Sequence, residues 1–292
     1  MNTPRILAAA TAAFLAGCQT QPAAVGPLAA GPRAVDAWLL GAPRVAEAAS
    51  GSEAPTPALL GAAIRCIEEQ ARVISANIAN ASTPAYKRTR VRVNEEELET
   101  GGHRYRVPVV AGVETVFSPG ALEATDRCLD VAVDGAGLFA VLGADGRTAY
   151  TRDGSFRVDA GGRLVTRAGH VVTPVITVPP DVLEISIDPV GVVSGRTASA
   201  PDVPCQFGRL ALHRFVNPSG LRFEDGQLGY VTQTSGRPTA GAPGREGFGL
   251  LKQGFREASN VDVSRELVDL QLLIQQQQTL TEALVHFGMI AP

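Results

Sequence analysis

Apolar residues recur at alternating steps of four and three along the stretch from residue 60 to residue 78. The stripe comprises Leu60, Ile64, Ile67, Ala71, Ile74 and Ile78. Apolar residues in this register form a heptad seam, which predicts a helix that packs along another helix. Thr56 and Pro57 suit the helix start, and Pro84 stops it because the residue before a proline avoids the α region.

A second helical pattern follows Asp262 and runs almost to the C-terminus. Its predicted seam begins with Val263, Leu267, Leu270 and Ile274. The register is lost at residues 275–278, where Gln277 takes a seam position, and a shifted apolar stripe follows. We therefore expect the two ends of the chain to pair into a helical stalk, firmly along residues 263–274 and loosely beyond.

Short alternating runs between these helices predict strands. Leu129, Val131 and Val133 alternate with polar or small residues, and Asp145-Gly146 and Asp153-Gly154 are typical hairpin turns. Strands that recur every eight to twelve residues without intervening helices predict an antiparallel sheet. The expected fold class is mainly β with α, as an elongated antiparallel β domain carried on a stalk formed by the N- and C-terminal helices.

The first residues have the pattern of a targeting segment. Arg5 precedes an apolar run over residues 6–15, which is too short to span a bilayer of about 30 Å as a helix. The run ends in Leu-Ala-Gly-Cys and resembles the lipobox of bacterial lipoproteins. That resemblance implies a lipid on Cys18, and Gln19 after it favours the outer membrane. The alternative is an ordinary signal peptide with a chance cysteine.

The segment after Cys18 is rich in Ala, Pro and Gly and lacks periodicity, which predicts a flexible tether. The expected organisation is a signal peptide at 1–17, a tether at 18–56, a stalk helix at 57–82, a β-rich domain at 83–258 and a C-terminal stalk helix at 259–292. Of the other cysteines, Cys66 lies beside the seam, which favours a buried thiol. Cys128 and Cys205 can pair only if the fold brings them within bonding distance.

Charge and motif spacing exclude several function classes. The net charge is −3, and the basic run at residues 87–92 is followed by four glutamates, so nucleic-acid binding is not expected. The Gly135-Ala136-Gly137 run lies between strands and opens no helix, which favours a turn over a phosphate loop. The adjacent Arg152 and Asp153 favour a local ion pair or an intersubunit contact over catalysis. We predict no metal, no cofactor and no small-molecule substrate.

Three motif blocks resemble one family, the flagellar rod and hook proteins. The first is N-I-A-N at residues 77–80, followed by S-T-P-A-Y-K-R, in which Ala85 stands where the family has glycine. The second covers residues 120–169 and includes Y-T-R-D-G-S-F. The third is L-K-Q-G-F-R-E-A-S-N-V-D-V at residues 251–263. The matching positions are Asn77, Asn80, Tyr86, Lys87, Tyr150, Arg152, Asp153, Gly154, Ser259, Asn260 and Val261.

The resemblance, which is strongest to distal rod proteins, implies a structural role and no enzymatic activity. It implies a subunit that associates with itself and with other rod and hook subunits, in a periplasmic helical tube that transmits torque. Glycine at position 85 is absent, so the turn there is expected to differ. The family segment Q-R-A-Y-E-x-N is replaced at residues 274–280.

Two hypotheses remain open because such proteins normally leave the cell through the flagellar type III channel and carry no cleaved signal. The first is a rod subunit that is secreted by its own signal and stays tethered to the outer membrane through Cys18. The second is a lipid-anchored periplasmic scaffold or binding protein with a rod-type fold that does not polymerise.

Overall fold

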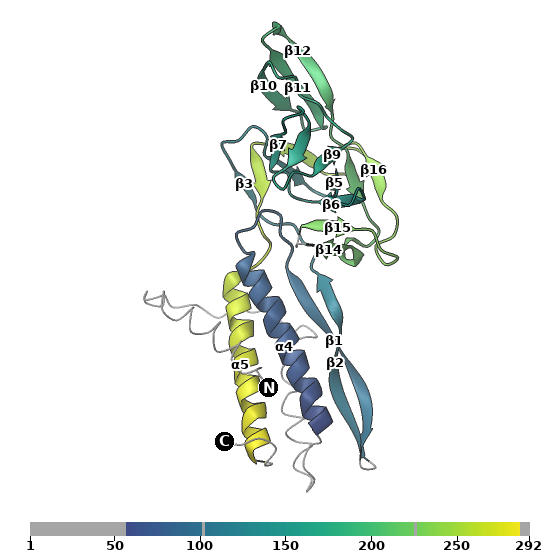
Figure 1. Ribbon diagram of the computed structural model, residues 1–292, viewed down its shortest axis with the longest axis vertical. Helices are drawn as coiled ribbons and strands as arrows, with labels where there is room; N and C mark the ends of the chain where they lie inside the picture. The colour runs from purple at the N-terminus through teal and green to yellow at the C-terminus, as the bar shows by residue number, and fades with distance from the viewer. Residues whose placement is uncertain (1–56, 101–102, 225–226, 287–292) are drawn as a thin grey trace, which may run out of the picture. The chain divides into compact units, whose positions relative to one another are not determined.

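The structure is a computed structural model that describes residues 57–100, 103–224 and 227–286 (Figure 1). Helix α4 spans Pro57–Ala79 and helix α5 spans Val263–His286. The predicted signal peptide and the predicted tether, with Cys18 and Thr56, lie outside the described residues. Within the described ranges, neither helix is long and apolar enough to cross a membrane.

The rest of the described chain is mostly strand. Two long strands follow α4, β1 at Thr89–Thr100 and β2 at His103–Thr115. The next strands are β3 (Leu122–Ala124), β4 (Val131–Asp134), β5 (Leu138–Leu142), β6 (Thr148–Thr151), β7 (Phe156–Val158), β8 (Leu164–Thr166) and β9 (Val171–Thr173). They are followed by β10 (Val182–Ile187), β11 (Val192–Thr197), β12 (Ala200–Arg209), β13 (Leu212–Arg214), the 3-10 turn η1 (Pro218–Gly220), β14 (Arg222–Glu224), β15 (Leu228–Tyr230), β16 (Thr239–Gly241), β17 (Leu250–Gln253) and β18 (Phe255–Glu257).

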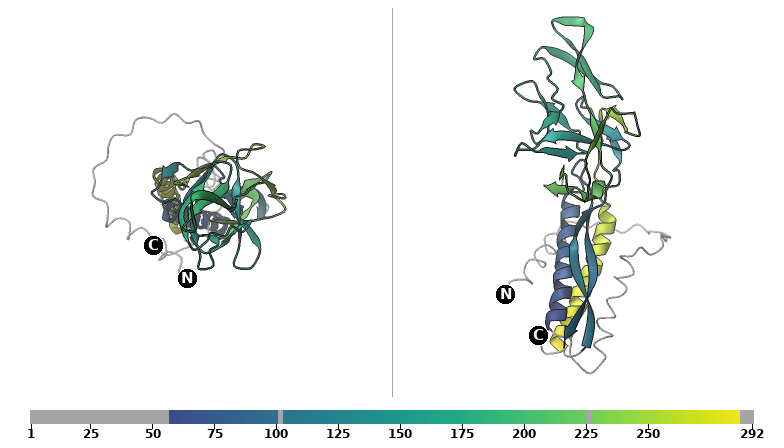
Figure 2. Two further views of the ribbon diagram at one scale, coloured as in Figure 1. Left: turned by 90° about the horizontal axis from the view of Figure 1, so that it is seen from above. Right: turned by 90° about the vertical axis from the view of Figure 1, so that its right-hand side faces the viewer.

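Helices α4 and α5 lie side by side, and the β1–β2 hairpin lies along α4 (Figures 1 and 2). The hairpin is antiparallel from Thr89 opposite Thr115 to Thr100 opposite His103, with a bulge after Arg92. Sequence patterns did not predict this hairpin. The two helices and the hairpin together are called the stalk below.

The apolar stripe of α4 is largely inside the stalk. Leu60, Ile67 and Ile74 are buried, while Ile64 and Ile78 are half-buried. Cys66 is buried beside them and its thiol is free. Burial raises the pKa of this thiol. The buried face of α4 is therefore wider than the heptad seam of a helix pair, because α4 packs against both α5 and the hairpin.

Helix α5 buries a different stripe from the predicted one. Its buried residues are Glu266 and Leu273, seven positions apart, whereas the predicted seam residue Val263 is 37% exposed. The other seam residues, Leu267, Leu270 and Ile274, are half-buried. The stripe is shifted because a buried position is taken by a glutamate that has polar partners on α4 and on the segment after it. A purely apolar pattern cannot locate such a position.

The remaining strands form the β domain, in which every pairing is antiparallel. Its main sheet runs β14-β15-β6-β5-β9-β8-β7, with β13 pairing with β5 and β16, and β10-β11-β12 form a second sheet. Strands β4 and β17 pair, as do β3 and β18. The core includes Phe139 and Phe156, whose rings meet edge to face with centroids 5.1 Å apart. The fold class is confirmed: mainly β and antiparallel, with a helix near each end. Cys128 and Cys205 are both free.

Candidate functional site: a buried polar junction

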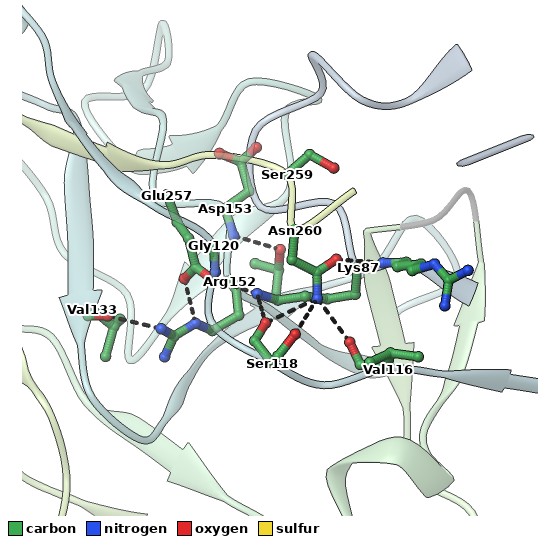
Figure 3. A network of polar contacts seen from close by, with 12 residues as sticks. Lys87, Val116, Ser118, Gly120, Val133, Arg152, Asp153, Glu257, Ser259 and Asn260 are labelled. Atoms are coloured by element: carbon green, nitrogen blue, oxygen red, sulfur yellow. Dashed lines mark hydrogen bonds and ion pairs between the residues drawn. The ribbon is translucent and has the colours of Figure 1, made fainter. Parts of the chain in front are cut away.

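Most of the family-motif residues gather in one group of polar contacts, and Figure 3 shows the part of it around Glu257, Lys87, Arg152 and Asn260. Four stretches of chain meet here: the end of α4 with the following turn, the segment after β2, the loop after β6, and the stretch from the end of β18 to the first turn of α5. This group of contacts is called the junction below. It is built from charged and amide side chains, most of which are buried: Asn77, Lys87, Arg152, Glu257 and Glu266.

Glu257 is at the centre of the junction, with a side chain that is 0% exposed. Its carboxylate accepts hydrogen bonds from Lys87, from the Gly120 amide at 2.9 Å and from Arg152 Nε at 2.7 Å. Lys87 also donates to the carbonyl of Ser118 at 2.8 Å. Burial lowers the pKa of the Lys87 ammonium, and the Glu257 carboxylate opposes that shift. One buried carboxylate thus holds two cations from distant parts of the chain.

Arg152 links Glu257 to the turn between β4 and β5 in the β domain. Its Nη1 donates to the carbonyls of Gly135 at 2.9 Å and Gly137 at 2.6 Å, and its Nη2 donates to Val133 at 2.8 Å. The Gly-Ala-Gly run therefore forms the turn between β4 and β5, and Arg152 fixes its shape. The predicted local ion pair between Arg152 and its neighbour Asp153 is wrong, because the guanidinium finds a better-placed carboxylate in Glu257.

Asp153 and Gly154 shape the turn that presents Arg152. The Asp153 carboxylate accepts a hydrogen bond from the Ser155 amide at 3.0 Å, as in an Asx turn. A Cβ at Gly154 would lie 1.8 Å from the carbonyl oxygen of Val131, so only glycine allows this approach. Asp153 and Gly154 therefore fix the backbone conformation of the turn that follows Arg152.

Asn77 ties the end of α4 to the start of α5. Its Nδ2 donates to the Thr89 carbonyl at 2.8 Å and to Glu266 Oε2 at 3.0 Å, while its Oδ1 accepts from the Thr89 amide at 2.9 Å. The Tyr86 hydroxyl lies 3.3 Å from the same Oδ1, and burial raises the pKa of that phenol. Arg88 pairs with Glu266 and, at 3.3 Å, with Asp269. The side-chain amide of Asn77 therefore has hydrogen-bond partners at both its nitrogen and its oxygen.

Asn260, in the segment between β18 and α5, makes a similar set of hydrogen bonds through its side-chain amide. Its Oδ1 accepts from the Arg88 amide at 2.6 Å, and its Nδ2 donates to the carbonyls of Val116 at 2.9 Å and Ser118 at 3.0 Å (Figure 3). The Ser259 hydroxyl accepts from the Val261 amide at 3.3 Å, which shapes the turn before α5. Asn260 therefore joins three segments through their backbones.

Two of the motif positions lie apart from the junction. Asn80 makes only local contacts, donating to the carbonyl of Ala76 at 2.9 Å and accepting from Thr83 at 3.2 Å. Tyr150 is in β6, where its ring meets Phe215 edge to face at 4.8 Å. Asn80 shapes the end of α4, and Tyr150 belongs to a second apolar cluster of the β domain.

The turn after α4 keeps a left-handed residue without glycine. Ala85 has φ of 58°, is buried, and donates its amide to the carbonyl of Glu257 at 2.8 Å. Ala85 thus adopts the positive φ for which glycine is best suited. The hydrogen bond and the packing around Ala85 hold the strained conformation in place, at a cost of about 1–2 kcal/mol.

Sequence reasoning missed Glu257 and Glu266 as site residues, although both stand in or beside the third motif block. The available signal was a glutamate within an otherwise strand-like or apolar run, which marks a buried partner for a cation. The junction offers no nucleophile with an adjacent base. Among the described residues, no group of three or more His, Cys, Asp or Glu is arranged to hold a metal ion.

Comparisons with known proteins give a consistent set of relatives. A family profile described as the flagellar hook protein FlgE/F/G D1 domain matches residues 132–195. A flagellar basal-body rod protein FlgG from Buchnera aphidicola subsp. Schizaphis graminum is 38% identical over 214 residues, covering 68% of this chain and 82% of the relative. FlgG of Borreliella burgdorferi is 33% identical, covering 68% and 81%. The rod protein FlgF of Escherichia coli is 32% identical, covering 72% and 84%.

Proposed function

This chain belongs to the family of flagellar basal-body rod proteins, and we infer that it is a structural subunit of the bacterial flagellar rod. The aligned relatives are named as rod proteins, and the aligned length exceeds four fifths of theirs. A structural role also agrees with the polar groups of the junction, which are used in holding the chain together. The comparisons offer no support for the alternative of a scaffold that does not polymerise.

The observation that carries this function is the junction itself. A subunit that transmits force between a helical layer and an outer β layer needs a stiff connection between the two. Here the buried pair of Lys87 and Glu257 joins the segment between α4 and β1 to the β domain, where Arg152 also binds Glu257. The buried hydrogen bond from Asn77 to Glu266 joins the two helices to each other. Buried and fully paired polar networks restrict a chain to one geometry.

The proposed assembly is a helical tube of like subunits with other rod and hook subunits above and below. Contacts between unlike surfaces of identical subunits build open helical filaments when the rotation does not close. Such a tube would carry torque through the periplasm. The role is structural rather than catalytic, and we propose no cofactor, substrate or nucleic acid.

We also propose that the subunit starts from a lipid anchor at Cys18 in the outer membrane. The support is the sequence of the first 18 residues, an apolar run that ends in Leu-Ala-Gly-Cys. Acyl chains on one residue add about 0.8 kcal/mol for each buried CH₂, so two or more give stable attachment. Labelling cells with radioactive palmitate tests this: wild type should be labelled and Cys18→Ala should not. An unlabelled wild type would remove the anchor and leave the rod assignment in place.

Deletion and complementation test the rod role. A strain without this chain should lose swimming in soft agar and should lack complete rods by electron microscopy, and the wild-type chain should restore both. A deletion strain with normal rods and normal swimming would contradict the proposed function.

A further inference from the structure

The stalk has an open apolar groove between α4 and the hairpin. It has a volume of about 370 Å³ and is lined by Ala62, Arg65, Glu69, Pro108, Val109 and Val110. No residue of α5 lines the groove, so the second helix of the stalk does not fill it. Pockets that bind ligands have volumes of about 300–1,000 Å³, so this groove is large enough to take a large side chain.

The free edge of strand β2 forms one wall of the groove. Three consecutive residues of β2, from Pro108 to Val110, line it. Successive side chains of a strand point to opposite faces, so three in a row line a groove only where it runs along the edge of the strand. Among the described strands, β2 pairs only with β1, which leaves its other edge without a partner strand. Such an edge accepts an extended segment through main-chain hydrogen bonds.

Residues 36–40 of the predicted tether have the chemistry that fits this groove. They read Asp-Ala-Trp-Leu-Leu and lie outside the described residues. Trp38, Leu39 and Leu40 are the only run of large apolar residues between residues 19 and 56. A tryptophan side chain buries about 150–250 Å² when it is covered. In an extended segment Asp36, Trp38 and Leu40 point to the same side, so one side presents both the apolar groups and a carboxylate.

We propose that residues 36–40 dock in this groove of their own chain, as an extended segment along β2 with Trp38 between α4 and Val109. Charge supports this occupant. Arg65 is exposed at the groove, and within the described residues it forms no ion pair or hydrogen bond. The Asp36 carboxylate is therefore an available partner for the Arg65 guanidinium when Trp38 is in the groove.

The length of chain before α4 also supports docking within one chain. Sixteen residues, 41–56, separate Leu40 from Pro57, the first residue of α4. A flexible chain of this length has a root-mean-square span of about 22 Å. At the helical rise per residue, Ala62 and Glu69 lie only about 8 Å and 18 Å along α4 from Pro57.

A linker that matches its span gives an effective concentration of the order of 1 mM. At that concentration, a contact with a dissociation constant of about 0.1 mM for the free segment is formed in about nine-tenths of the chains. The docked segment holds the part of the chain that carries Cys18 close to the stalk. This contact does not depend on the rod role.

Fluorescence of Trp38 tests the contact, because it is the only tryptophan of the chain. The full chain would carry Cys18→Ala, so that it takes no lipid, and quenching by acrylamide would be measured. Quenching should be several-fold weaker than in the same chain unfolded in urea. Ala62→Gln fills the groove from α4 with a good helix former and should restore most of the quenching. Ser75→Gln, at an exposed position of α4 outside the groove, is the matched control and should restore none.

Cross-linking within one chain locates the segment independently. Ala37→Cys and Val109→Cys would be combined in a chain with Cys18, Cys128 and Cys205 replaced by serine, while the buried Cys66 stays. A short bismaleimide should link the two introduced cysteines within a monomer. The control combines Ala37→Cys with Val216→Cys and should link several-fold more slowly, since Val216 is 94% exposed but belongs to the β domain.

The outcomes separate this contact from other occupants and from the rod role. Equal quenching in the parent chain and in Ala62→Gln would overturn the proposal, as would equal cross-linking rates for the two cysteine pairs. A link that forms between separate Ala37→Cys and Val109→Cys chains, and not within one chain, would assign the groove to a second copy and overturn docking within the chain. If Ala62→Gln lowers the melting temperature, the cross-linking rates decide. All these measurements use the isolated chain, so a negative result leaves the rod assignment in place.

Discussion

Asn77 in the last turns of α4 donates a buried hydrogen bond of 3.0 Å to Glu266 in the first turn of α5, although the two residues are 189 positions apart. This contact joins the C-terminal end of α4 to the N-terminal end of α5. The same amide also binds the backbone of Thr89, where the hairpin begins. One side chain therefore sets the relative placement of both helices and the hairpin.

Replacing Asn77 by alanine should be costly, because it leaves buried partners without hydrogen bonds. The amide and carbonyl of Thr89 and one oxygen of Glu266 would all lose a partner. We expect a loss of about 2–3 kcal/mol in the free energy of unfolding, measured by urea denaturation. Asn80→Ala is the matched control, since its contacts are local and partly exposed. Equal losses for the two variants would contradict the assigned role of Asn77.

Glu257→Gln should destabilise the chain more strongly. The glutamine keeps the shape but leaves Lys87 and Arg152 buried without a counter-charge. Breaking a buried ion pair from one side costs about 3–5 kcal/mol. The control is Glu123→Gln, whose pair with Arg256 is exposed and should be worth less than about 1 kcal/mol. Adding Lys87→Met to Glu257→Gln should recover part of the loss; no recovery would mean that Lys87 is not the coupled partner.

Ala85→Gly should stabilise the chain. Ala85 is held at φ of 58°, where glycine has no steric penalty, and the gain should outweigh the lost methyl contacts by about 0.5–1 kcal/mol. Thermal unfolding of the purified chain measures the effect. Ala81→Gly, in the same turn but without positive φ, should give no gain. A lower melting temperature for Ala85→Gly would show that the buried methyl group matters more than the backbone strain.

His213 should make the β domain sensitive to acid. Burial lowers the pKa of this imidazole below its usual 6.5, and its Nδ1 has no hydrogen-bond partner in the described structure. Between the lowered folded pKa and 6.5 the unfolded chain binds more protons, so stability falls as the pH drops through this window. Melting temperatures at pH 7.5 and pH 5 should therefore differ less in His213→Gln than in wild type. An identical difference in both would exclude His213 as the cause.

Gln277→Leu should raise the melting temperature by a few degrees. Gln277 is half-buried in α5, at a position where the helical register predicts an apolar residue. A buried leucine contributes up to about 1.5–3 kcal/mol relative to an exposed one, and partial burial gives a fraction of that. Gln275→Leu, on an exposed position, should leave the melting temperature unchanged. A drop for Gln277→Leu would mean that its amide has a polar partner.

Periodicity was sufficient to predict the helices and the antiparallel character of the β domain. Leu60, Ile67 and Ile74 occupy buried positions, and the turn at residues 145–146 joins the hairpin of β5 and β6 as its sequence suggests. These features depend on residues close together in the sequence, which a local pattern can register. The family motifs likewise identified several residues that meet at the junction, such as Lys87, Arg152 and Asn260, but not its central Glu257. The predicted hairpin at residues 153–154 is wrong, because β6 and β7 on either side of it do not pair with each other.

The polar contacts could not be predicted from a local pattern. Glu257 can be buried because Lys87 and Arg152 pair with it. These partners lie 170 and 105 positions away in the sequence, and only the fold brings the three together. Glu266 displaces an apolar residue from the buried stripe of α5 for the same reason. Strand β2 was missed because its partner face is α4, which a pattern within the strand cannot show.

The assignment as a rod subunit is tested most directly by the protein content of isolated basal bodies. Basal bodies should be prepared from cells that produce the wild-type chain and from cells that produce Glu257→Gln, and probed with an antibody to this chain. Wild type should be present at many copies per basal body, in proportion to other rod proteins, and Glu257→Gln should be strongly reduced. A wild-type chain that is found in the envelope but is absent from basal bodies would contradict the account.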